Sequence, residues 1–309
     1  MSYVHTPILV SEIIKHLVKD DDKLFIDCTL GEGGHSEVVL TKFSNIVVYG
    51  LDRDKEILEI ARKRLSVFGE RFNGLNINFR DVSLANIKKG GALFDSALID
   101  LGISMFHYKK SERGFSFSKK EKLDMTLDNE SESVFEIIND FDEEALSAIF
   151  FEFGEERFSR RVAKKIVELR KLKAIEYSDQ LADIIFGAIP RKFHNRRIHP
   201  ATKCFQALRI YANKELENIK IGIPIVLSIL KNTGRLGVIT FHSIEDRLVK
   251  NIFNELNKDC LCPKELPFCQ CGGNNRKVNW IAKSIKPSLE EISMNPASRS
   301  AKLRIVEKI

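Results

Sequence analysis

The chain has 309 residues, of which 43% are hydrophobic and 30% are charged, a composition typical of a globular protein that buries a core without disulfides. Its formal net charge of +6 permits an anionic partner but does not require one. No apolar run is long enough to span a bilayer, and residues 1–7 lack the basic stretch and apolar core of a signal peptide. We therefore expect a cytoplasmic protein that makes no membrane contact.

The first third of the chain alternates short β-rich runs with helical patterns. The predicted elements are, in chain order, strand 24–27, helix 36–43, strand 46–51, helix 55–68, strand 76–82 and strand 96–99. Alternation of this kind indicates a parallel sheet whose strands are joined by right-handed crossovers.

The pattern changes from residue 108 to about residue 218, where no strand is expected. Helices are predicted at residues 133–139, 143–153, 158–171 and 178–188, and residues 157–161 and 191–199 are basic. Further strands are predicted at residues 234–241, 278–283 and 301–307. The simplest account is an α/β domain formed by residues 1–106 and 219–309, interrupted by an inserted helical domain at residues 107–218.

A glycine-rich turn follows the first predicted strand, where residues 27–36 read Asp-Cys-Thr-Leu-Gly-Glu-Gly-Gly-His-Ser. Glycines allow the backbone to turn sharply and to approach a ligand, and the helix that follows presents free N–H donors. Asp52 closes the next predicted strand, where an acid can accept hydrogen bonds from both hydroxyls of a ribose. Gly33, Gly34 and Asp52 therefore predict an adenosine-containing ligand.

The spacing of the glycines separates the candidate ligands. A dinucleotide site requires Gly-x-Gly-x-x-Gly, and the third glycine here falls in the wrong place; no Gly-Lys-Ser/Thr follows that would bind a triphosphate. S-adenosylmethionine has no phosphate, and Asp27 and Asp100 would supply negative charge near its cationic end. We therefore predict S-adenosylmethionine as the cofactor.

The fourth predicted strand ends in Asp100-Leu101-Gly102-Ile103-Ser104, at the edge of the sheet where ligands bind in open α/β folds. Methylation of a pyrimidine ring carbon needs a cysteine nucleophile, and residues 100–106 contain none. An exocyclic amine needs no covalent step, because an oxygen that accepts one of its hydrogens localises the lone pair for attack on the methyl group. Asp100 and Ser104 are the predicted catalytic residues; the alternative is that Asp100 only forms hydrogen bonds with the cofactor.

The fifth strand of the α/β domain ends in Phe241-His242, at the same edge, so His242 is predicted to act as an acid–base group or as a contact to the base. In the insert, two interpretations are open for residues 199–202 and Arg209: they bind phosphates, or they cap and pair helices. Arg276, Lys277 and the stretch 299–304 add positive charge that could meet phosphate, or pair with acids of the sheet.

Many ordered motifs resemble the bacterial family of small-subunit ribosomal RNA cytosine-N4 methyltransferases, and the resemblance covers nearly the whole chain. Beyond the glycine turn and the segment 100–104, the matching motifs are residues 5–9 (HTPIL), 113–117 (RGFSF), 123–125 (LDM), 153–156 (FGEE), 199–202 (HPAT), 205–210 (FQALRI), 213–216 (NKEL), 241–247 (FHSIEDR) and 295–304 (NPASRSAKLR).

The resemblance implies a class I S-adenosylmethionine-dependent methyltransferase fold, Rossmann-like, with a helical domain inserted after the fourth strand. It implies methylation of a cytosine amino group in the decoding centre of 16S ribosomal RNA, with the small ribosomal subunit as partner and no DNA. The family's cofactor-binding positions fall on Gly33, Gly34, His35, Asp52, Phe79, Asp100 and His107.

Two positions depart from the family pattern. His107 stands where the family has a glutamine. Each nitrogen of an imidazole ring can donate or accept one hydrogen bond, but not both. Thr126 follows Met125 where the family has an arginine, so one phosphate contact or internal pair is expected to be missing.

Four cysteines cluster near the end of the chain, at Cys260, Cys262, Cys269 and Cys271. Four thiolates suit tetrahedral zinc, although the Cys-x-Cys spacing is tighter than the common one. The alternative is a loop of reduced thiols near the RNA. Cys28 and Cys204 lie in apolar patterns and are expected to be buried thiols without a metal.

Two other functions compete with an RNA amino-methyltransferase. The same fold could methylate DNA or a small molecule, but a compact substrate would not need the basic helical insert. A non-catalytic RNA-binding or assembly protein could keep the fold, but it would have no need of the glycine turn, Asp100 and His242.

Overall fold

The computed structural model describes residues 7–309 except 88–90, 129–130, 196–197 and 264–267. The chain forms two compact units, the first made of Met1–Ile103 and Leu216–Ile309, and the second of Ser104–Glu215. The opening His5 and Thr6 of the first family motif, and the basic Arg196 and Arg197, lie outside the described residues.

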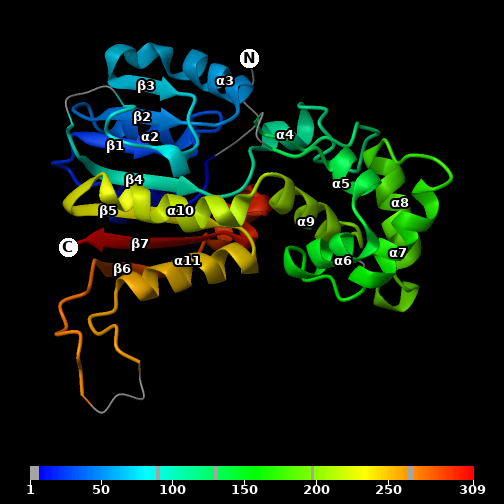
Figure 1. The fold of residues 1–309 in the computed structure, drawn as a ribbon. Helices are drawn as coiled ribbons and strands as arrows, with labels where there is room; N and C mark the ends of the chain where they lie inside the picture. Colours follow the sequence, from blue (N-terminus) through cyan, green and yellow to red (C-terminus); the bar gives the residue numbers. More distant parts are fainter. Residues whose placement is uncertain (1–6, 88–90, 129–130, 196–197, 264–267) are drawn as a thin grey trace. The chain divides into compact units, whose positions relative to one another are not determined.

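The first unit is built on a single sheet whose strands run in the order β3-β2-β1-β4-β5-β7-β6 (Figure 1). The strands are β1 (Leu24–Asp27), β2 (Val47–Leu51), β3 (Phe72–Leu75), β4 (Phe94–Asp100), β5 (Leu230–Thr240), β6 (Val278–Ile285) and β7 (Lys302–Lys308). The pairs from β3 to β5 are parallel, whereas β7 is antiparallel to both of its neighbours. The predicted α/β fold class is confirmed. From β1 the chain passes outward to β2 and β3 on one side and then returns to β4 and β5 on the other. In open α/β sheets, ligands bind at the carboxyl ends of the strands where the strand order switches in this way.

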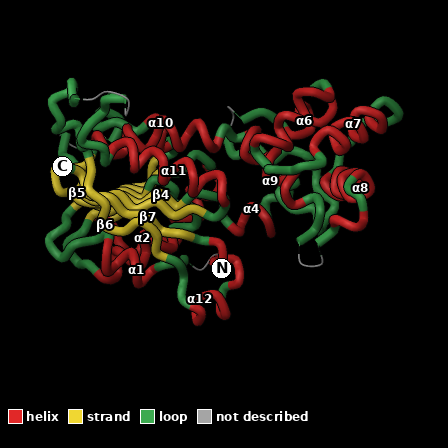
Figure 2. The backbone as a smooth tube through the Cα atoms, turned by 90° about the horizontal axis from the view of Figure 1, so that it is seen from below, coloured by secondary structure: helices red, strands yellow, loops and turns green. Residues whose placement is uncertain are grey.

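Helices cover both faces of this sheet. They are α1 (Val10–His16), α2 (Gly34–Lys42), α3 (Lys55–Leu65), α10 (Glu215–Ser228), α11 (Ser243–Leu256) and α12 (Leu289–Met294). Figure 2 shows α10 and α11 on one face and α1 and α2 on the other. The central strands β1 and β4 are buried along nearly their whole length, and their residues 24–26 and 97–99 are all apolar, as expected for parallel strands between helical layers.

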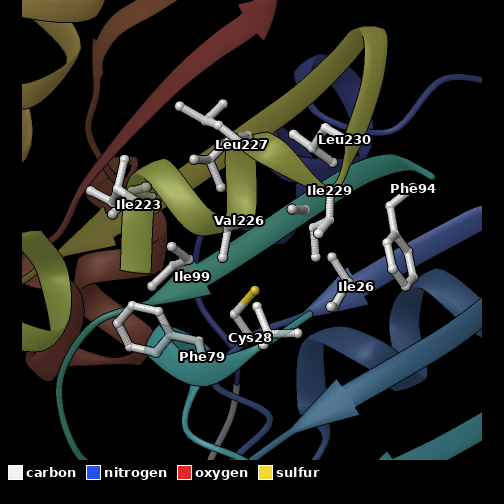
Figure 3. Close-up of a cluster of buried hydrophobic side chains, with 14 of the residues drawn as sticks. Ile26, Cys28, Phe79, Phe94, Ile99, Ile223, Val226, Leu227, Ile229 and Leu230 are labelled. Carbon is white, nitrogen blue, oxygen red and sulfur yellow. The ribbon is translucent and has the colours of Figure 1, made fainter. Parts of the chain in front are cut away.

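Each face has its own apolar core. On the α10–α11 side, Cys28 and Ile99 pack among Ile223, Val226 and other aliphatic side chains, as Figure 3 shows. On the opposite side, Ile13 of α1 and Val39 of α2 belong to a second core with Leu58 and Leu65 of α3. Packing on both faces fixes the ends of the strands, and therefore the positions of the polar residues that follow them.

The predicted strand at residues 76–82 is wrong. The edge strand β3 ends at Leu75, and Phe79–Asp81 form a 3₁₀ turn. The alternation of Ile77 and Phe79 imitates a strand, but the Phe79 ring packs against α10, where a Cβ on Gly222 would lie 2.2 Å from it. Since β3 is only partly buried along its length, its sequence carries little of the apolar signal that marks an inner strand.

The second unit is helical. Its α-helices are α4 (Met105–Lys109), α5 (Val134–Asp140), α6 (Glu143–Glu152), α7 (Ser159–Arg170), α8 (Ser178–Ala188) and α9 (Thr202–Ala212). Residues 133–139, 143–153, 158–171 and 178–188 are helical nearly as predicted, and outside the gaps in this unit the only strand-like pairing is a bridge between Lys122 and Tyr177. Leu146, Phe150 and Ile166 are among its fully buried side chains.

None of the helices within the described residues is long and apolar enough to cross a membrane.

Candidate active site

The turn between β1 and α2 is held open by glycines. Gly31 has a φ of +53°, and a Cβ added to it would meet no heavy atom within 4 Å. Gly33, with a φ of +80°, precedes the first residue of α2, and a Cβ there would lie 2.9 Å from Leu65 of α3. The turn therefore combines a close helix–helix approach at Gly33 with open space at Gly31, which is the arrangement that a ligand lying over the backbone requires.

Asp52 follows β2 and faces this turn. Its Oδ2 accepts a hydrogen bond from the Gly31 N–H at 2.8 Å, and its Oδ1 accepts one from the Asp54 N–H at 2.9 Å. These two backbone donors fix the direction of the carboxylate, which is an acceptor at both oxygens when ionised. The ends of β1 and β2 thus present a glycine turn and an oriented acid side by side.

Asp100 is the last residue of β4, and its side chain is 13% exposed. Its N–H donates to Thr29 Oγ1 at 2.6 Å, which ties the end of β4 to the glycine turn. Within the part of the chain that the structure describes, Oδ1 of Asp100 is buried and has no hydrogen-bond partner. A buried polar atom without a partner is costly, so its presence at this edge indicates that a ligand completes it.

The surroundings of Asp100 favour its uncharged form. Burial raises the pKa of its carboxyl well above the usual value, and the nearby carboxylates of Asp27 and Glu245 raise it further. Burial also raises the pKa of Asp27 to about 6, although the Ser36 hydroxyl, which donates to Asp27 at 2.7 Å, opposes the shift. A cation placed among these acids would relieve their repulsion and would be bound more tightly than a neutral molecule of the same shape.

His35, in the first turn of α2, faces Asp100 with Nδ1 3.6 Å from Oδ2. Its Nε2 lies 2.9 Å from the Ile8 carbonyl oxygen, which can only accept, so Nε2 carries the hydrogen of the neutral ring. Burial lowers the pKa of His35 to about 4, so the ring is neutral near pH 7. The unprotonated Nδ1 therefore faces Asp100, and a protonated Asp100 suits that neighbour.

His242 lies at the start of α11, directly after β5. Its Nδ1 accepts a hydrogen bond from the Glu245 N–H at 3.4 Å, and its Nε2 is 2.9 Å from Glu245 Oε1. Glu245 is 1% exposed and also accepts from the Phe241 N–H. The ring therefore caps α11 at the same edge of the sheet as Asp100, held in place by Glu245.

Phe79 belongs to the apolar core on the α10–α11 side and is 8% exposed. Figure 3 shows its ring near Ile99 in the same core. Among the predicted cofactor-binding residues it is the one whose environment is almost entirely apolar, which suits the face of an aromatic base rather than a polar group.

Ser104 and His107 belong to the second unit. The Ser104 hydroxyl accepts from the Phe106 N–H at 3.2 Å and caps α4. His107 is 4% exposed, and its ring centroid lies 5.3 Å from that of Phe115. The Thr126 hydroxyl, in the place of the family arginine, donates to Asp124, and its carbonyl accepts from Arg113.

Arg209 and His199 are explained by packing within the helical unit. Arg209 forms two hydrogen bonds with Glu215, at 2.8 and 2.9 Å, and is 9% exposed, so it pairs helices rather than presenting a charge to phosphate. The Nδ1 of His199 accepts from the Ala201 N–H, which makes it a local cap. In the first unit, Arg304 likewise pairs with Asp246 at 2.7 Å.

Several residues that build the site carried no distinct signal in the sequence. Thr29 joins two strand ends through its hydroxyl, and Glu245 holds His242 in a pattern related to the capping box, in which a residue three places into a helix reaches back to the cap. That spacing could have indicated Glu245, whereas the contact of His35 with Ile8 depends on how α1 packs. The late cysteines are brought together outside this site.

A seven-stranded sheet with an antiparallel β7, a glycine turn after β1 and an acid after β2 define a class I S-adenosylmethionine-dependent methyltransferase fold. The model of the MraW methylase family matches residues 2–309, and the chain belongs to that family.

Relatives of similar length match along the whole chain. A protein of Treponema denticola named ribosomal RNA small subunit methyltransferase H is 47% identical, over 100% of this chain and 98% of its own. A protein of Carboxydothermus hydrogenoformans with the same name is 41% identical, over 100% and 99%. The structure of an rRNA methylase from Streptococcus thermophilus, which is 12% identical, is a distant likeness with a TM-score of 0.42 over 100% of this chain and 99% of that one.

Proposed function

We propose that this protein transfers the methyl group of S-adenosylmethionine to the exocyclic N4 amino group of a cytosine in the decoding centre of 16S ribosomal RNA, within the small ribosomal subunit. The observation that carries the chemistry is the buried Asp100 carboxyl, whose Oδ1 has no partner among the described residues, at the strand end beside the glycine turn. The family membership and the full-length relatives named for the small ribosomal subunit support the substrate.

The residues at the ends of β1 and β2 are assigned to cofactor binding. The backbone of Gly31 leaves room for the ligand, whereas Gly33 and Gly34 let the turn pack closely against Leu65 and Pro7. The oriented Asp52 carboxylate accepts from ribose hydroxyls. When bound, S-adenosylmethionine supplies an activated methyl group and a positive charge. Phe79 offers an apolar surface for the base, and His107 is assigned to the cofactor by its place in the family pattern.

Asp100 is assigned two linked tasks. Next to a bound cation its carboxyl ionises, because positive charge lowers the pKa that burial has raised. The ionised Oδ1 then accepts a hydrogen bond from the amino group, which localises the nitrogen lone pair toward the methyl group. The unprotonated Nδ1 of His35 lies 3.6 Å from the other oxygen, Oδ2. Ser104 and His242 are proposed to position the base.

The helical unit, Ser104–Glu215, is proposed to recognise the RNA. Its exposed surface combines cations with aromatic rings: the Arg157 guanidinium lies 3.9 Å from the centroid of Phe193, which is 42% exposed, and Lys192 lies 5.0 Å from it. Such pairs suit phosphates and unstacked bases. A small molecule would have no use for this surface, so it favours a nucleic acid substrate.

The test is methyl transfer from labelled S-adenosylmethionine to small ribosomal subunits from a strain that lacks this enzyme, followed by mass spectrometry of the digested RNA. We expect label on N4 of one cytosine in the decoding centre. Asp100→Asn should abolish the transfer, whereas Asp95→Asn, the same change at the opposite end of β4, should retain it. Label on a ring carbon, on DNA or on protein would contradict the proposal.

A further inference from the structure

The four late cysteines come together in the loop between α11 and β6, which Figure 1 shows leaving and returning to the sheet. The Sγ atom of Cys260 lies 3.6 Å from that of Cys269 and 3.8 Å from that of Cys271, and Cys269 and Cys271 are 3.6 Å apart. With Cys262, all four sulfur atoms lie within 4.8 Å of one another.

These distances have the size that a tetrahedral metal site requires. Four thiolates bound at about 2.3 Å from one zinc ion stand about 3.8 Å apart. A disulfide instead brings two sulfurs to about 2.05 Å and leaves the pairs separate. Here each of Cys260, Cys269 and Cys271 has the other two at nearly the same distance, so the cluster has no preferred pair.

Hydrogen-bond donors point at the sulfurs. Cys262 Sγ accepts from the N–H groups of Gln270 and Cys271 at 3.2 and 3.3 Å, and Cys271 Sγ accepts from the Leu261 N–H at 3.3 Å. Asn275 Nδ2 donates to Cys271 Sγ at 3.3 Å as well. Donors of this kind stabilise thiolate charge and orient metal ligands, whereas neutral thiols have little need of them.

The described residues of the loop, 257–263 and 268–277, form no apolar core of their own. Leu261 is 58% exposed and Phe268 is 81% exposed, so neither side chain holds the cysteines together. Its two ends are fastened by backbone bonds, from Lys277 N–H to Leu256 O at 2.8 Å and from Asn275 N–H to Asp259 O at 3.2 Å. Something other than apolar burial must therefore hold the four cysteines together, and metal binding supplies folding free energy in small sites of this kind.

We infer that Cys260, Cys262, Cys269 and Cys271 bind one structural zinc ion that fastens the loop after α11. The site is closed, because the four thiolates complete a tetrahedron and leave no position for substrate. It lies in a loop apart from Asp100 and the glycine turn, so its role is to shape this surface of the protein. Zinc binding can therefore be tested independently of methyl transfer.

The test is metal analysis of the full chain purified under reducing conditions without a metal-affinity step. We expect about one zinc ion per chain, and loss of that zinc in Cys271→Ala and Cys262→Ala. Cys204→Ala is the matched control, because Cys204 is a fully buried thiol of the helical unit and its removal should leave the zinc in place.

Cobalt titration of the metal-free wild-type protein gives a second measurement that does not depend on a variant folding. We expect the strong visible bands of tetrahedral cobalt bound by thiolates, saturating at about one ion per chain and displaced by zinc. Failure of the reduced wild-type protein to bind either ion would overturn the inference, as would iron in the purified protein, disulfides among these four residues, or full zinc content in Cys271→Ala.

Discussion

The substitution Gly31→Ala separates the demands of the fold from those of the cofactor. An alanine at the positive φ of Gly31, +53°, costs about 1–2 kcal/mol of unfolding free energy. The new methyl group meets no protein atom within 4 Å, so the folded protein has room for it. If that room belongs to the cofactor, the methyl group overpacks the complex by about 1–3 kcal/mol, which is a loss of about 5- to 150-fold in affinity.

Gly69→Ala is the matched control. Gly69 has a φ of +57° and likewise no heavy atom within 4 Å of an added Cβ, but it lies in the 3₁₀ segment after α3. Denaturant unfolding should show a loss for both variants, larger for Gly69→Ala because its φ of +57° and ψ of −131° are adopted almost only by glycine. Calorimetric titration with S-adenosylmethionine should show weaker binding only for Gly31→Ala. Equal affinities in the two variants would refute the placement of the cofactor over this turn.

Three further predictions concern charged groups. Asp52→Ala should weaken S-adenosylmethionine binding by about 1.5–3 kcal/mol, the worth of a hydrogen bond to a charged acceptor, and unchanged affinity by calorimetry would refute the placement of the ribose. Binding of S-adenosylmethionine at pH 7 should release a proton from Asp100, whose pKa burial has raised, whereas the product S-adenosylhomocysteine, which lacks the sulfonium charge, should release fewer protons. Calorimetry in two buffers of different ionisation enthalpy measures the number of protons released, and an equal number for Asp100→Asn would contradict the prediction. Because the pKa of His35 is lowered from 6.5 to about 4, the stability that it contributes is complete above pH 6.5 and is lost as the pH falls toward 4, by about 3 kcal/mol. Denaturant unfolding at pH 7 and pH 4.5 should show this loss in the wild-type protein but not in His35→Gln. Asp27, whose raised pKa acts in the opposite direction, is present in both proteins.

The fold was predictable where local patterns decide it. The β1 and β4 runs are apolar and end at acids, and the helices of the insert follow a 3.6-residue period, so both could be located from the sequence alone. The position of β3 could not, because an edge strand buries little and the apolar alternation near Phe79 serves packing against α10 instead. The antiparallel insertion of β7 between β5 and β6 depends on pairing between distant segments, which no local pattern reports.

The site was predictable to the extent that residues at strand ends must share one edge. Asp52 and Asp100 follow from that rule, and the structure places both beside the glycine turn. The neutral state of His35 depends on its burial, and the contact between Glu245 and His242 depends on packing around the start of α11, so both are seen only in the folded chain. Arg209, which was open between phosphate contact and helix pairing, is resolved by its partner Glu215. The catalytic roles of Asp100, Ser104 and His242 stay predictions.

The most direct measurement is a crystal structure of the protein with S-adenosylhomocysteine bound. The account predicts the ribose within hydrogen-bonding distance of the Asp52 carboxylate, the backbone of Gly31 against the ligand, and the sulfur directed at the buried Oδ1 of Asp100. Density for the ligand away from the ends of β1, β2 and β4, with Asp52 and Asp100 bonded only as they are in its absence, would contradict it.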